Sequence, residues 1–143
     1  MSHLKKIAIV YLGHRGAGPI FTLRLAAALS ERAITKVFLS HSISNYEEWK
    51  KENLDTAFFH VPHTTREALN PTQIFTLRKT MCSKIKEFHP DICLFTMIYP
   101  MNFLIQHSLK KSGYKIVSII HDPFKVGIVF TDKFILYYKI LIG

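Results

Sequence analysis

The feature that most constrains the fold is a junction near the amino terminus, where an apolar run leads into a glycine-rich loop. Residues 7–12 form an apolar segment of strand length, and three glycines follow between residues 13 and 18. Pro19 then opens a helical pattern, because proline is favoured at the first position of a helix. We predict a buried strand, a loop with little side-chain cover and a helix N-terminus facing that loop. Such a junction is suited to an anion or to the close approach of a ligand.

Five short apolar runs along the chain are typical of strands, at residues 7–12, 37–40, 56–60, 92–96 and 115–120. The runs are continuous rather than alternating, which is the pattern of strands covered on both faces. Helical patterns separate most of them, at 19–32, in a short stretch at 45–51, after Asn70, and from Pro100 to Gly113. We therefore predict an α/β, Rossmann-like parallel sheet with helices on both faces and right-handed crossovers. Residues 61–69 are predicted to form a loop.

The helix after Asn70 has a clear predicted start. Asn70 is a capping residue, Pro71 takes the first helical position, and Gln73 stands where a capping box places its partner. An apolar face and a mostly basic face follow along the helix. The apolar face holds Ile74, Leu77, Met81, Cys82, Ile85 and Phe88, and the basic residues are Arg78, Lys79, Lys84 and Lys86.

Composition narrows the class of protein. The chain has 143 residues and is 48% hydrophobic, which excludes a disordered chain. Its formal net charge of +9 favours anionic partners, either nucleic acid, an acidic membrane surface or phosphorylated ligands, although a merely solvated basic surface gives the same count. Cys82 and Cys93 belong to no C-x-x-C unit and are predicted to be core thiols in a reducing compartment. Neither a secretion signal nor a membrane span is evident, so we predict a cytoplasmic protein.

The glycine spacing argues against two common nucleotide sites. A dinucleotide site needs G-x-G-x-x-G and an acidic residue after the second strand, whereas this loop has G-x-x-G-x-G and the second strand ends in Ser40-His41. A P-loop needs Gly-Lys-Ser/Thr, and Pro19-Ile20 stands in that place. No RNA-binding signature is present either, so we predict no nucleic-acid partner.

Two interpretations of the loop remain. In the first, Gly16 and Gly18 let a sugar or a phosphate approach the backbone, with Arg15 and His14 as hydrogen-bond donors. In the second, the loop is a tight strand-to-helix turn without a ligand.

His121-Asp122-Pro123 directly follows the fifth apolar run. In a parallel sheet this places His121 at the same carboxyl edge as the glycine loop, where an imidazole can hydrogen-bond a substrate hydroxyl or stabilise developing charge. Asp122-Pro123 is also a favoured turn, so a structural role stays open. His60 and His63 have a spacing that can hold a metal ion, but no third ligand stands nearby in the sequence, so we predict structural or surface roles for them and no metal site.

The glycine loop, the strand–helix alternation and His121-Asp122-Pro123 together resemble the amino-terminal domain of GT-B glycosyltransferases. The resemblance is strongest to the family-4 (group 1) retaining enzymes that build bacterial polysaccharides and glycolipids. The segment His89-Pro90-Asp91-Ile92, followed by apolar residues, matches a recurring strand of that family. The resemblance implies that His121 is catalytic and contacts the transferred sugar. It further implies that Gly16, Gly18, Arg15 and Asp122 bind substrate or shape its site.

In that family a second Rossmann-like domain supplies an E-x(7)-E motif and most contacts to the nucleotide sugar. The resemblance therefore implies that residues 1–127 are the acceptor-side domain and that 128–143 are an apolar tail, an incomplete element of the same domain. We expect a truncated enzyme that is inactive alone and uses no cofactor. Its expected partners are a nucleotide-sugar donor, a polysaccharide or lipid-linked acceptor and the inner face of the cell membrane. The alternative is a non-catalytic Rossmann-like module that binds a nucleotide or a protein.

Overall fold

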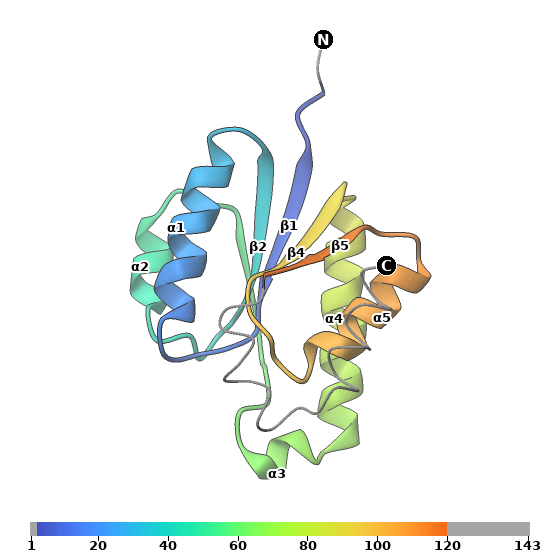
Figure 1. Cartoon of the computed structure of the whole chain (residues 1–143). Helices are drawn as coiled ribbons and strands as arrows, with labels where there is room; N and C mark the ends of the chain where they lie inside the picture. The colour runs from blue at the N-terminus through green and yellow to red at the C-terminus, as the bar shows by residue number, and fades with distance from the viewer. Residues whose placement is uncertain (1–2, 120–143) are drawn as a thin grey trace.

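The computed structural model describes residues 3–119 (Figure 1). The order of its elements is β1 (Lys6–Tyr11), α1 (Gly18–Ser30), β2 (Ile34–Ser40), α2 (Tyr46–Lys51), β3 (Thr56–Phe59), α3 (Thr65–Ala68), α4 (Pro71–Phe88), β4 (Ile92–Phe95), α5 (Asn102–Lys111) and β5 (Ile116–Ser118). Each apolar run predicted to be a strand forms one, with ends shifted by at most three residues.

All five strands belong to one parallel sheet with the order β3-β2-β1-β4-β5. The chain builds the sheet outward from β1 to β3, and α4 then crosses back so that β4 pairs with the other side of β1. The strand order therefore reverses between β1 and β4. In open α/β sheets, ligands bind outside the carboxyl ends of the strands at this point of reversal.

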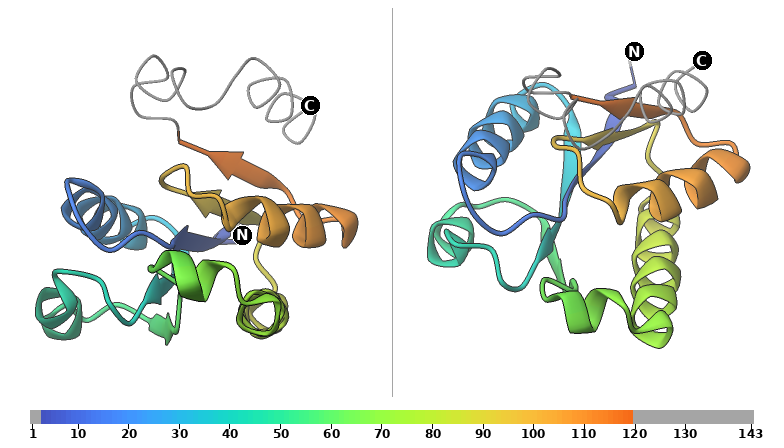
Figure 2. Two further views of the ribbon diagram at one scale, coloured as in Figure 1. Left: turned by 90° about the horizontal axis from the view of Figure 1, so that it is seen from below. Right: turned by 60° about the horizontal axis from the view of Figure 1, so that its bottom comes forward.

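Helices cover both faces of the sheet, as the continuous apolar strands predicted (Figure 1). Successive residues of a strand point to opposite faces, so β1 contributes to two cores. Ala8 and Val10 pack in the core under α4 and α5, whereas Ile9 and Tyr11 pack in the core under α1 and α2. Seen from below the sheet, the two pairs of helices lie on opposite sides of it (Figure 2, left).

The predicted apolar face of α4 is confirmed. Two of the basic residues, Arg78 and Lys86, do not lie opposite it but line a cleft together with Cys82. Leu77, Met81, Cys82 and Ile85 are buried against the sheet and α5. Cys82 and Cys93 are both buried free thiols.

The predicted loop at residues 61–69 was wrong, because it contains α3. The Thr64 side chain accepts from the backbone N–H of Glu67, and the Glu67 carboxylate accepts in return from the backbone N–H of Thr64. Four residues are too few for an apolar period to be visible, so only this reciprocal cap marks the helix. The capping box predicted at Gln73 does not form, because the Asn70 N–H donates instead to the carbonyl oxygen of Glu67 at the end of α3.

Candidate functional site

The glycine loop closes around the ring of Tyr11. A Cβ atom added at Gly13 would lie 2.5 Å from the Tyr11 hydroxyl oxygen, and one added at Gly18 would lie 2.4 Å from it and 2.8 Å from the sulfur of Met97. The Tyr11 hydroxyl donates to the carbonyl oxygen of Arg15 at 3.4 Å, and burial raises the pKa of Tyr11 to about 12. The space freed by these two glycines is therefore occupied by a tyrosine ring.

Gly16 has a different role in the same loop. Its φ angle of +83° lies in the left-handed region, and a Cβ atom there would meet nothing within 4 Å. The residue is exposed. Gly16 thus supplies the backbone conformation of the turn and leaves open space beside it.

The start of α1 is tied to the loop that follows β4. The Thr22 hydroxyl lies 2.8 Å from the Thr96 hydroxyl, and both residues are fully buried. The asparagine at the start of α5, Asn102, donates to the carbonyl oxygen of Met97 at 2.6 Å. The β1–β4 reversal point is therefore bridged by hydrogen bonds within the protein.

An open pocket of about 400 Å³ lies beside this point, at the carboxyl ends of β1, β2 and β3. Its lining is mostly polar and comes from three separate loops. The lining residues are His14, Arg15, Ser42, Ser44, His60, Val61, His63, Thr64 and Glu67. The loops after β1 and β2 are joined by a hydrogen bond from the Ser44 backbone N–H to the His14 carbonyl oxygen at 2.8 Å. Figure 2 (right) brings this edge of the sheet forward.

His63 is the most constrained side chain of the pocket. Its Nε2 atom lies 2.9 Å from the Ser40 hydroxyl, and its ring centroid lies 4.1 Å from that of His14. Its Nδ1 atom is buried and has no hydrogen-bond partner. Burial, followed by the nearby His14, lowers the pKa of His63 below its ordinary value. The neutral imidazole is therefore favoured, with one ring nitrogen uncommitted.

Among the described residues, Glu67 is the only carboxylate in the lining. One carboxylate oxygen accepts from the backbone N–H groups of His63 at 3.1 Å and Thr64 at 3.3 Å, and the other lies 3.6 Å from Nε2 of His60. These hydrogen bonds, led by that from His63, lower the pKa of Glu67. The carboxylate is thus ionised, and both of its oxygens already interact with groups of its own loop.

The pocket offers hydroxyl groups, imidazole rings and the exposed guanidinium of Arg15. These groups can hydrogen-bond a hydroxyl-rich ligand, and Arg15 can pair with an anionic group on it. Within residues 3–119, no three His, Cys, Asp or Glu side chains are arranged to hold a metal ion. In the same part of the chain, no helix is both long and apolar enough to cross a bilayer.

The predicted site residues are placed as follows. Arg15 lines the pocket, Gly16 stands in the adjoining turn, and Gly18 lies buried against Tyr11. His121 and Asp122 lie outside the described residues, as do the predicted boundary at 127 and the tail 128–143. The site roles of all five residues stay predictions.

Sequence analysis missed the association of His14, His60, His63 and Glu67. The two histidines after β3 were predicted to have structural or surface roles, because no third metal ligand stands near them in the sequence. The sheet order brings the loops after β1 and β3 together in one pocket. Residue spacing along the chain does not indicate this association. It follows from the topology, because residues 14 and 63 each come after a parallel strand, and the carboxyl ends of parallel strands lie at one edge of the sheet.

No protein-family model matches this sequence, and no curated protein matches it significantly. Solved structures do match. A glycosyltransferase from Rickettsia africae superimposes with a TM-score of 0.63 at 15% identity, over 92% of this chain and 34% of that one. MurG from Acinetobacter baumannii gives 0.65 at 11% identity, over 81% and 35%. The C-terminal domain of a hydrogenase from Pyrococcus furiosus gives 0.59 at 12% identity, over 80% and 91%.

At these identities the likeness concerns the fold. The chain spans about a third of the length of the two glycosyltransferases, and it matches the hydrogenase domain over nearly all of that domain. The predicted Rossmann-like α/β class is confirmed. This chain has the fold of one segment of the GT-B glycosyltransferases. That segment is about a third of their length.

Proposed function

We propose that this chain is the acceptor-side Rossmann-like domain of a glycosyltransferase. The intact enzyme would transfer a sugar from a nucleotide-sugar donor to a polysaccharide or lipid-linked acceptor. One observation carries the proposal: a polar pocket rich in hydroxyl and imidazole groups adjoins the glycine loop at the carboxyl edge of a sheet with a glycosyltransferase fold. Hydroxyls and neutral imidazoles are the groups that recognise sugar hydroxyls.

In this proposal Arg15 and the open backbone at Gly16 receive the substrate, beside the pocket wall that His63 lines. Gly18 acts indirectly, by seating Tyr11 beneath the loop. His121 hydrogen-bonds the transferred sugar and Asp122 holds the turn after the fifth strand. The chain acts in the cytoplasm, and its basic surface favours contact with the anionic inner face of the membrane.

Binding studied by heteronuclear NMR tests this proposal. The probes are UDP, GDP, UDP-glucose, GDP-mannose and the oligosaccharide maltotriose, each added to the labelled chain. We expect the sugar-bearing probes to shift the amide signals of Arg15, Gly16 and His63 more than the bare nucleotides do. An Arg15→Gln variant should weaken these shifts, whereas Arg32→Gln, which removes an exposed cation far along the chain, should leave them unchanged.

The alternative function predicts a different result. The alternative is a non-catalytic module that binds a nucleotide or a protein, since the same fold also makes up nearly the whole of a domain in an unrelated protein, a hydrogenase. Equal shifts from UDP and UDP-glucose would support that module, and no shift from any probe would contradict the glycosyltransferase proposal. The coding sequence beyond codon 143 gives a second test, since an E-x(7)-E motif there supports the enzyme and unrelated sequence argues against it.

A further inference from the structure

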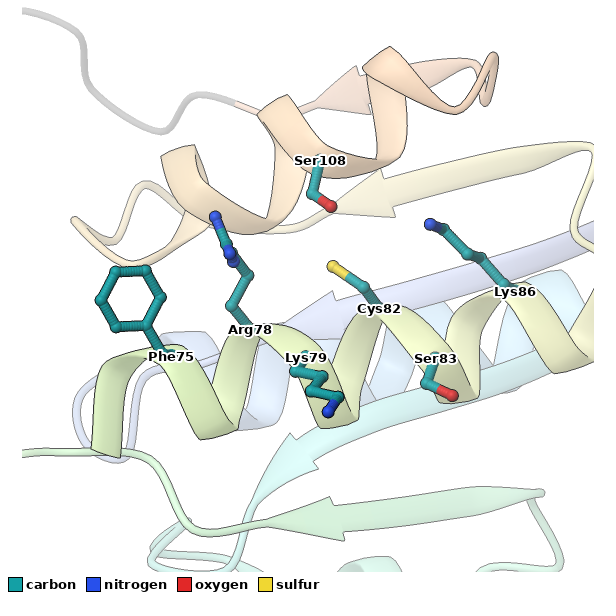
Figure 3. Close-up of a pocket in the computed structure, with 7 residues that line it drawn as sticks. All are labelled: Phe75, Arg78, Lys79, Cys82, Ser83, Lys86 and Ser108. Carbon is teal, nitrogen blue, oxygen red and sulfur yellow. The ribbon is translucent and has the colours of Figure 1, made fainter. Parts of the chain in front are cut away.

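A second cleft lies between α4 and α5, on the outer side of the layer that these helices form (Figure 3). Its volume is about 440 Å³. The residues that line it are Phe75, Arg78, Lys79, Cys82, Ser83, Lys86 and Ser108. They include three cations and two hydroxyl groups but no carboxylate, and none of them lines the pocket at the carboxyl edge.

Two of the three cations of this cleft, Arg78 and Lys86, point toward α5, whereas Lys79 points away from it (Figure 3). Arg78, Cys82 and Lys86 follow one another at four-residue intervals on α4 and point toward α5, from which Ser108 points back (Figure 3). Arg78 and Lys86 are separated by about 12 Å along the helix axis. Burial raises the pKa of the Cys82 thiol, and the hydrogen bond with the Ser108 side chain, followed by the charges of Lys86 and Arg78, opposes this rise.

In the described part of the chain, neither Arg78 nor Lys86 belongs to an ion pair. Within residues 3–119 the ion pairs are formed by other lysines and a histidine, and the nearest acid along α4, Glu87, is paired with Lys84 at 2.9 Å. The Arg78 guanidinium instead lies 5.1 Å from the ring centre of Phe75, a side chain that is 56% exposed. An aromatic ring holds a cation in place without cancelling its charge.

We propose that the α4–α5 cleft binds a phosphate group, with Arg78 and Lys86 approaching it from two sides and the Ser108 hydroxyl donating from α5. Guanidinium and ammonium groups form charge-assisted hydrogen bonds to phosphate. The exposed ring of Phe75 adds an apolar contact for whatever carries the phosphate. This site is independent of the proposed glycosyltransferase activity. The phosphate comes either from a soluble phosphorylated compound or from a lipid headgroup.

The test uses the whole chain and two kinds of probe. The soluble probes are inorganic phosphate and glycerol 3-phosphate, followed by the amide signals of Cys82, Ser83 and Ser108 at constant ionic strength set with chloride. The membrane probes are vesicles of phosphatidylcholine, with or without phosphatidylglycerol, measured by co-sedimentation. We expect saturable binding that the double variant Arg78→Gln/Lys86→Gln weakens at least about tenfold. The matched control, Arg32→Gln/Lys51→Gln, removes the same charge from exposed positions elsewhere and should change binding less than about twofold.

Each outcome supports or overturns the proposal, or identifies the source of the phosphate group. Saturable shifts with the soluble probes support a site for a free phosphorylated compound. Binding to anionic vesicles alone, lost in the double variant, supports a lipid headgroup as the source. The proposal is overturned if neither probe binds, if chloride reproduces the shifts, or if the control variant loses as much binding as the cleft variant. Circular dichroism of both variants checks that they are folded.

Discussion

Gly18→Ala tests whether the glycine loop is shaped by Tyr11. The new Cβ atom would lie 2.4 Å from the Tyr11 hydroxyl oxygen and 2.8 Å from the Met97 sulfur, whereas ordinary contacts begin at 3.4 Å. Alanine at the first position of a helix would otherwise stabilise the protein by about 0.5–1 kcal/mol. Forcing one extra methyl into a packed site costs about 1–3 kcal/mol. Because Tyr11 is buried on all sides and cannot swing away, we expect a net loss of about 1–2 kcal/mol.

The loss is measured by urea denaturation, followed by the fluorescence of the only tryptophan, Trp49, which is buried under α2. A double-mutant cycle with Tyr11→Leu identifies the cause. Leucine removes the atoms that clash, and the flexible Met97 side chain can move aside, so we expect a favourable coupling of about 1–3 kcal/mol between the two substitutions.

Gly16→Ala is the matched control. It should cost about 1 kcal/mol through its left-handed backbone alone and should show coupling below about 0.5 kcal/mol to Tyr11→Leu, because its Cβ atom meets nothing within 4 Å. The reasoning fails if Gly18→Ala is as stable as the parent chain, or if the cycle with Tyr11→Leu is additive. Either result would indicate instead that residue 18 is a glycine so that a ligand can approach the loop.

Three further perturbations address the pocket and its surroundings. Because the pKa of His63 is lower in the folded chain than in the unfolded one, its contribution to stability should be complete above about pH 6.5 and should be lost as the pH falls below that value. His63→Asn should flatten this decline in thermal melts, and an unchanged slope would assign the decline to other groups. Thr22→Val removes one hydroxyl of the buried pair with Thr96 and should cost about 1 kcal/mol in urea denaturation, with no loss if the pair contributes nothing. Glu67→Ala removes the reciprocal cap of α3 and should cost about 1 kcal/mol. It should also speed amide exchange of His63 and Thr64, and unchanged exchange would show that another group holds this loop.

The set of residues that line the pocket could not be predicted from the sequence. His14 and His63 could each be placed after a strand, but their contact depends on β2 lying between β1 and β3. No local pattern specifies which strands become neighbours. The role of Tyr11 was hidden for a related reason: an aromatic residue at the end of an apolar run predicts burial, not the loop that it supports.

By itself, the sequence determined the alternation of strands and helices, the two-sided burial of the sheet and the amphipathic character of α4. These follow from apolar periodicity and capping, which act between residues at most a few positions apart. Only the tertiary structure decided that two of the three glycines seat a tyrosine, that polar residues from three separate loops form one pocket, and that Arg78 and Lys86 flank a cleft beside α5. Those features arise from packing between segments that are far apart in the chain, and packing is fixed by the order of strands in the sheet rather than by the composition of any one segment.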